Sequence, residues 1–158
     1  MPQTLLLAVA MTLLAVLPAR AQAPELGAEK AELLRLLAQD RRAHFETSVD
    51  LLMERTPDTM ISVSNGAVRR IAKADFRQMF VGVFRGATYQ EWEPIEEPIV
   101  RISNDASMAW IITRLRVRRL KTQDDGNGQL ESFTYAGIMT YEKRNGRWMK
   151  VANVSTFE

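Results

Sequence analysis

The single histidine, His44, is the residue best suited to acid–base chemistry in this sequence. Asp40 lies four residues earlier, so in a helix its carboxylate would orient the imidazole and raise its pKa. Glu96 is the second candidate, because a carboxyl group in an apolar cup has a raised pKa and can transfer a proton. His44, Asp40 and Glu96 are therefore the candidate catalytic residues. Each also has a structural interpretation: His44 as a packed side chain, and Glu96 turned outward by a bulge at Pro94 or Pro98.

Other kinds of chemistry have little support. With one His and no Cys, only carboxylates remain as metal ligands. The sequence has no Gly-rich phosphate loop and no G-x-S-x-G motif, so we expect no metal and no cofactor. Arg114, Arg116 and Arg118 share one strand face, but the formal net charge is only +2. We expect a salt-bridged outer face here and no nucleic-acid partner.

The N-terminal residues are typical of a targeting signal. Leu5 to Leu17 is almost purely apolar, but it is shorter than the about 20 residues that span a bilayer. Ala19-Arg20-Ala21 follows and fits a signal-peptidase site. We therefore predict a signal peptide over residues 1–21, one domain over 22–158, a periplasmic or secreted location, and no membrane contact after cleavage. The alternative is an uncleaved anchor or a buried helix.

The elements that position the candidate residues follow from periodicity and turn signals. Apolar residues at helical spacing predict a first helix from Ala28 to Glu54, with His44 on its apolar face. Thr59–Ser64 and Ala67–Ile71 are predicted strands, joined by a turn at Asn65-Gly66 with positive φ at both positions. Lys73–Phe84 is a predicted second helix.

Long strands follow. A turn at Asn104-Asp105 would place Glu93 opposite Arg116 and Glu91 opposite Arg118. The other face of these strands would then be concave. It carries Trp92, Leu115 and Thr113, with Glu96 opposite Thr113. The next turns are expected at Asp124–Gly128 and Asn145-Gly146, and they separate the strands Gln129–Lys143 and Arg147–Phe157. Gly137 within the first of these indicates a bend.

This order of elements resembles the nuclear transport factor 2-like superfamily, and within it the small SnoaL-like and ketosteroid-isomerase-like bacterial proteins. The residues that carry the resemblance are loose motifs: Asp50-Leu51-Leu52, Asn65-Gly66, Lys73-Ala74-Asp75, Asp105 with Ala109-Trp110, and Arg144-Asn145-Gly146-Arg147-Trp148 followed by Val151-Ala152-Asn153. The resemblance implies an α+β, conical (cystatin-like) fold, in which a strongly curved, mostly antiparallel sheet wraps around the N-terminal helices. It also implies a pocket inside the cone and frequent dimers, but no single activity.

The expected pocket combines the helix face that carries His44 with the concave face of the sheet. Its predicted lining is His44, Trp92, Thr113, Tyr135 and Asn153. The preferred function is the binding of a small hydrophobic organic ligand without an established reaction. One alternative is a cofactor-free lyase or isomerase; another is a dimeric interaction module without ligand. Trp110 and Ile112 on the expected outer face predict a homodimer.

Overall fold

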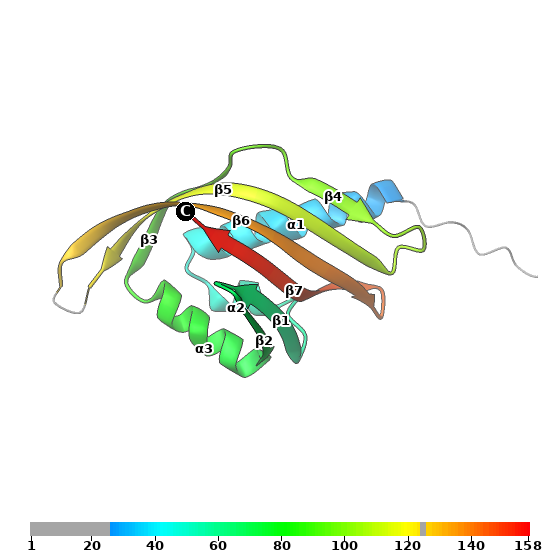
Figure 1. Cartoon of the computed structure of the whole chain (residues 1–158), viewed down its shortest axis with the longest axis horizontal. Coiled ribbons are helices and arrows are strands. Elements are labelled where there is room, and N and C mark those ends of the chain that lie inside the picture. Colours follow the sequence, from blue (N-terminus) through cyan, green and yellow to red (C-terminus); the bar gives the residue numbers. More distant parts are fainter. Residues whose placement is uncertain (1–25, 124–125) are drawn as a thin grey trace, which may run out of the picture.

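The computed structural model of the protein describes residues 26–123 and 126–158. Within these ranges the chain forms three helices and one seven-stranded sheet (Figure 1). The helices are α1 (Leu26–Phe45), α2 (Val49–Met53) and α3 (Lys73–Phe84). The strands are β1 (Thr59–Ser64), β2 (Ala67–Ala72), β3 (Ala87–Pro94), β4 (Ile99–Ile102), β5 (Met108–Thr122), β6 (Gly128–Arg144) and β7 (Arg147–Phe157). The predicted signal peptide lies outside the described residues, as do Asp124 and Asp125 of the predicted hairpin tip.

The strands form one curved sheet in the order β2-β1-β7-β6-β5-β3, and β4 also pairs with β5. All described pairs are antiparallel except β1 with β7, which is parallel. Figure 1 shows β5, β6 and β7 arching above α3 and the β1–β2 hairpin, with α1 behind these strands. The predicted α+β class with a strongly curved, mostly antiparallel sheet is therefore confirmed.

The first helix is shorter than predicted, and the expected range from Ala28 to Glu54 is wrong. α1 ends at Phe45 because Thr47 adopts a left-handed conformation with φ 48°. The amides of Thr47 and Ser48 donate to the carbonyls of His44 and Ala43, the paired closure of a Schellman motif. The Ser48 hydroxyl then caps α2 by accepting from the Leu51 amide. Neither Gly nor Pro marks the end of α1 in the sequence. Helical periodicity alone therefore extends the predicted helix to Glu54.

Two predicted turns and the β3–β5 register agree with the sequence. Asn65 and Gly66 have φ values of 51° and 74°, as a two-residue turn with positive φ at both positions requires. Asn145 and Gly146 repeat this geometry at the last turn. Glu93 pairs with Arg116 in the β3–β5 ladder, which also confirms the predicted register there.

The two-residue turn predicted at Asn104-Asp105 is wrong, because Ile102 pairs with Ala109 rather than with Ser107 and the connection is two residues longer.

The predicted position of Glu96 is wrong. Pro94 pairs with Leu115, and the next paired residue, Ile99, lies opposite Ile112. The chain therefore takes five residues from Pro94 to Ile99 while β5 takes three. The excess loops out between β3 and β4, and Glu96 lies exposed in this loop rather than opposite Thr113 on the concave face. Proline cannot donate a ladder hydrogen bond, so Pro94 and Pro98 bound the interruption.

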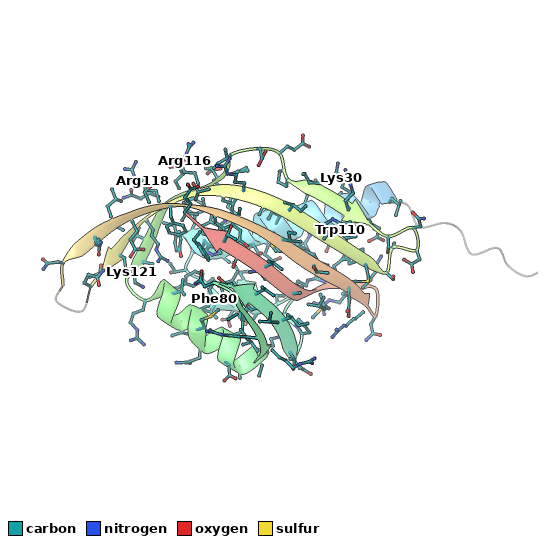
Figure 2. All side chains as sticks on the ribbon, viewed as in Figure 1. Lys30, Phe80, Trp110, Arg116, Arg118 and Lys121 are labelled. Atoms are coloured by element: carbon teal, nitrogen blue, oxygen red, sulfur yellow. The ribbon has the colours of Figure 1, made fainter. Side chains whose placement is uncertain are left out.

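The concave face packs into two clusters of buried side chains. One lies under α1, where Leu33 and Leu36 contact a group that includes Ile111, Tyr141 and Trp148. The other lies between α2, α3 and the opposite part of the sheet, and includes Met60 and Phe76. On the outer face of β5, Arg116 and Arg118 project away from the side of the sheet where Phe80 of α3 lies (Figure 2).

Candidate functional site

A cavity of about 500 Å³ lies between the concave face of the sheet and the helices. Most of its wall is apolar, and a large part of it comes from Phe76, Met79, Phe80 and Val83, all on one face of α3. Phe133 of β6 and Phe157 of β7 add aromatic surface. The helical spacing of the α3 residues follows from an amphipathic pattern. This apolar stripe packs in the buried cluster between α2, α3 and the sheet, and it also borders the cavity.

The structure places all five predicted pocket residues, His44, Trp92, Thr113, Tyr135 and Asn153, on the wall of this cavity. The carboxylate candidate Asp40 also lines it. Glu96, in the β3–β4 loop, does not belong to the wall. Of the three candidate catalytic residues, the fold thus brings two together and leaves the third outside.

His44 is fixed by a hydrogen bond and by stacking. Its Nδ1 donates to the backbone carbonyl of Asp40 at 2.7 Å, since a carbonyl oxygen can only accept. The imidazole stacks on Trp92, with ring centroids 3.6 Å apart and an interplanar angle of 17°. Phe84 and Tyr89 contact the imidazole in T-shaped geometry, with ring centroids 5.4 and 5.3 Å from that of His44. In the neutral ring, Nε2 is therefore an acceptor.

The expected rise in the pKa of His44 is wrong. Burial lowers this pKa from 6.5 to about 4, and this outweighs the smaller raising effects of the Asp40 carbonyl and carboxylate. Desolvation penalises the charged imidazolium, and only 7% of the residue is exposed. His44 is consequently neutral at neutral pH and a weak proton acceptor.

The side chain of Asp40 has a different partner from the one expected. Its Oδ2 accepts from Nζ of Lys150 at 2.5 Å, and both side chains are mostly buried. Lys150 faces the cavity side because it alternates with the buried Trp148. Tyr141 then pairs with Lys150 and Thr140 with Ala152, which leaves Val151 as an extra residue and brings Asn153 to the same face. Such a bulge re-aims the side chains on either side of it. Strict alternation would have placed Lys150 and Asn153 on opposite faces, so alternation along β7 does not predict that both line the cavity.

Gly137 provides space for Tyr135. A Cβ added at Gly137 would lie 2.3 Å from the Tyr135 hydroxyl oxygen, so any larger residue would displace the phenol. The hydroxyl donates to Oδ1 of Asn153 at 3.1 Å. Burial raises the pKa of Tyr135 to about 12, so the phenol remains a proton donor at neutral pH. The predicted bend at Gly137 thus has a second role, as the surface on which a cavity side chain rests.

Hydroxyl groups form a polar side of the cavity that sequence reasoning missed. Ser62 lies between Arg69 of β2 and Asn153 of β7 in one row across the strands. Ser64 and Ser155 form the next row, and all of these residues line the cavity. The sequence pattern does indicate this position, because Ser62 and Ser64 alternate with the same period as the buried Met60 and must share its face.

Further along the sheet, the Thr113 hydroxyl is buried without a hydrogen-bond partner in the described structure.

Comparisons with known proteins identify the fold. No family model and no curated protein matches the sequence. Solved structures do match: a nuclear transport factor 2-like protein from Cytophaga hutchinsonii is 12% identical, with a TM-score of 0.64 over 81% of this chain and 97% of that one. A ketosteroid isomerase-like protein from Erwinia carotovora atroseptica is 14% identical, with a TM-score of 0.62 over 84% and 95%.

A third similar structure, a nuclear transport factor 2-like protein with a cystatin-like fold from Novosphingobium aromaticivorans, is 16% identical, with a TM-score of 0.60 over 82% of both chains. The chain therefore has the nuclear transport factor 2-like, cystatin-like fold that the resemblance predicts. At these identities the comparisons establish the fold and carry no activity over to this chain.

Residues 26–123 and 126–158 contain no group of three or more His, Asp or Glu side chains placed to hold a metal ion. None of the helices in these ranges combines the length and the apolar character that a membrane crossing needs.

The lowered pKa of His44 predicts a pH-dependent stability. The unfolded chain takes up this proton near pH 6.5, the folded protein only near pH 4. The contribution of His44 is therefore complete above pH 6.5 and is lost as the pH falls towards 4. The loss in unfolding free energy is on the order of 3 kcal/mol. Urea unfolding at a series of pH values measures it, and His44→Phe should lack this part of the pH dependence. Equal pH dependence of the two proteins would contradict the prediction.

Proposed function

We propose that the protein binds a small, largely apolar organic molecule in the cavity between the sheet and the helices. The observation that carries this proposal is the cavity itself, which at about 500 Å³ has the size typical of small-molecule sites. Its composition supports the same conclusion: an aromatic and aliphatic wall, with a few polar groups on one side that could orient a ligand.

The alternative of a cofactor-free lyase or isomerase has weaker support. That chemistry needs a proton acceptor with a pKa near the working pH. The pKa of His44 is lowered to about 4, and the Asp40 carboxylate is paired with Lys150. Glu96 lies outside the cavity. The arrangement therefore favours binding over proton abstraction by any of the three candidates.

The alternative of an interaction module without ligand would fit a filled cone. The described side chains instead leave a hollow that reaches from Leu37 of α1 to Phe157 of β7.

For the place of action, we propose the periplasm or the exterior of the cell. This rests on the apolar segment Leu5 to Leu17 and the Ala19-Arg20-Ala21 site, which lie outside the described residues.

We also propose that two copies associate through the outer face of the sheet. An apolar row runs across it from Ile99 of β4 through Ile112, Ile138 and Val154, which are paired neighbours on successive strands. Trp110 lies beside this row and is 41% exposed. Ile99, Ile138 and Val154 are exposed and Ile112 is partly exposed. An apolar row of this kind is typical of a protein–protein contact, and a second copy brings the same row to meet it.

Ligand binding is tested by blocking the cavity. N-phenylnaphthylamine, a neutral fluorescent probe, should bind the wild-type protein saturably with one site per chain. Ser62→Trp places a large ring on the cavity wall and should weaken this binding at least about tenfold, because the ring occupies the ligand's space. Ser132→Trp, the same change at an exposed position of β6, is the matched control. Saturable binding that is equally strong in both variants would contradict the proposal.

Association is tested by light scattering on the purified protein. Trp110→Glu introduces a charge into the apolar face and should convert the dimer into a monomer, because the charge would have to be desolvated in the contact. Leu130→Glu is the control: it changes another exposed apolar residue near the start of β6, away from the row. A monomeric wild-type protein at micromolar concentration, or a Trp110→Glu variant that still dimerises, would overturn the proposal.

A further inference from the structure

The charged residues on the cavity wall are not all neutralised. Four charged side chains line the cavity: Asp40, Arg69, Arg119 and Lys150. Asp40 and Lys150 form an ion pair at 2.5 Å. Arg119 pairs with Glu131 at 2.6 Å and donates to the Tyr89 hydroxyl at 2.9 Å. Within the described structure, Arg69 has neither a hydrogen bond nor an ion pair. The cavity thus has one cation without a counter-charge.

Arg69 lies at the polar side of the cavity and not among its aromatic residues. In the cross-strand row Arg69 lies opposite Ser62, which in turn lies beside Asn153. Ser64 and Ser155 form the adjoining row. Hydroxyl and amide N–H donors therefore surround the guanidinium side of the wall, a combination that suits an anionic oxygen group.

The rest of the wall has the opposite character. Phe76 and Phe80 of α3 and Phe133 of β6 present aromatic surface, and they form part of a chain of ring contacts that reaches His44 and Trp92. A ligand that satisfies both sides has an apolar body and a polar end. Because burying an unpaired charge is costly, the charge on the polar end of the ligand must be opposite to that of Arg69, the lining residue without a counter-charge.

We propose that the ligand is an amphiphilic monoanion, whose apolar ring or chain lies against the aromatic wall and whose carboxylate, or chemically similar head group, binds Arg69 and Ser62. This inference rests on the proposed ligand-binding function and narrows it to a class. A second negative charge would have no partner, since the other lining cations are already paired. A cationic ligand would meet the charge of Arg69 directly, which opposes binding.

A matched pair of probes tests the charge of the ligand. Anilinonaphthalenesulfonate and N-phenylnaphthylamine share one aromatic skeleton and differ in the sulfonate, so the ratio of their dissociation constants isolates the anionic head group. We expect the anionic probe to bind the wild-type protein about fivefold more tightly, the size of a partly exposed ion pair. Arg69 is exposed on the edge strand β2. Raising the ionic strength should therefore reduce this preference, because salt screens exposed charges.

Variants of Arg69 assign the preference to this residue. Arg69→Gln should weaken binding of the anionic probe about fivefold and leave the neutral probe unchanged. Arg69→Lys retains the charge and should recover most of the preference. Arg70→Gln is the matched control, because Arg70 is the next residue of β2, pairs with Ile61 and does not line the cavity.

The outcomes separate the two levels of the proposal. If neither probe binds saturably, the ligand-binding function fails. If the neutral probe binds but the anionic probe binds no more tightly, the function stands and the monoanion class is wrong. The class is also wrong if Arg69→Gln and Arg70→Gln affect the anionic probe equally, or if Arg69→Lys is as weak as Arg69→Gln.

Discussion

The ion pair between Asp40 of α1 and Lys150 of β7 is the interaction on which the site most depends. Its two side chains are 18% and 11% exposed, so removing one partner would leave the other charge in a poorly solvated place. Loss of one member of such a buried pair costs about 3–5 kcal/mol. The pair holds the helix that carries His44 against the strand that carries Asn153, and the bulge at Val151 brings Asn153 to the same face as Lys150.

This attachment divides the concave side of the sheet into a filled part and a hollow part. Under the first half of α1, Leu33 and Trp148 pack with almost no exposure. Beyond Asp40, the wall is formed instead by the stacked pair of His44 and Trp92, by Tyr135 resting on Gly137, and by α3. These aromatic side chains are held by contacts with one another and with the backbone, so they can border a cavity without collapsing into it.

Much of this arrangement could be predicted from the sequence, because it follows from local patterns. The turn at Asn65-Gly66 and the pairing of Glu93 with Arg116 depend on turn chemistry and alternation. The features that were missed depend on contacts between distant segments. The left-handed residue Thr47, the loop that carries Glu96 outward and the bulge at Val151 each change the direction of the chain without a Gly at the decisive position.

The contrast between local patterns and contacts of distant segments also explains which residues of the candidate site could be predicted. Alternation and helical periodicity placed five residues on the cavity wall, whereas Lys150 and Arg69 become visible only when the strands are assembled.

The most direct test of a hollow cone that holds an apolar ligand is an NMR measurement of through-space contacts between N-phenylnaphthylamine and isotope-labelled protein. We predict cross-peaks to the ring protons of His44, Trp92 and Phe80. Cross-peaks confined to outer-face residues such as Trp110, or none at saturating probe, would contradict the central claim.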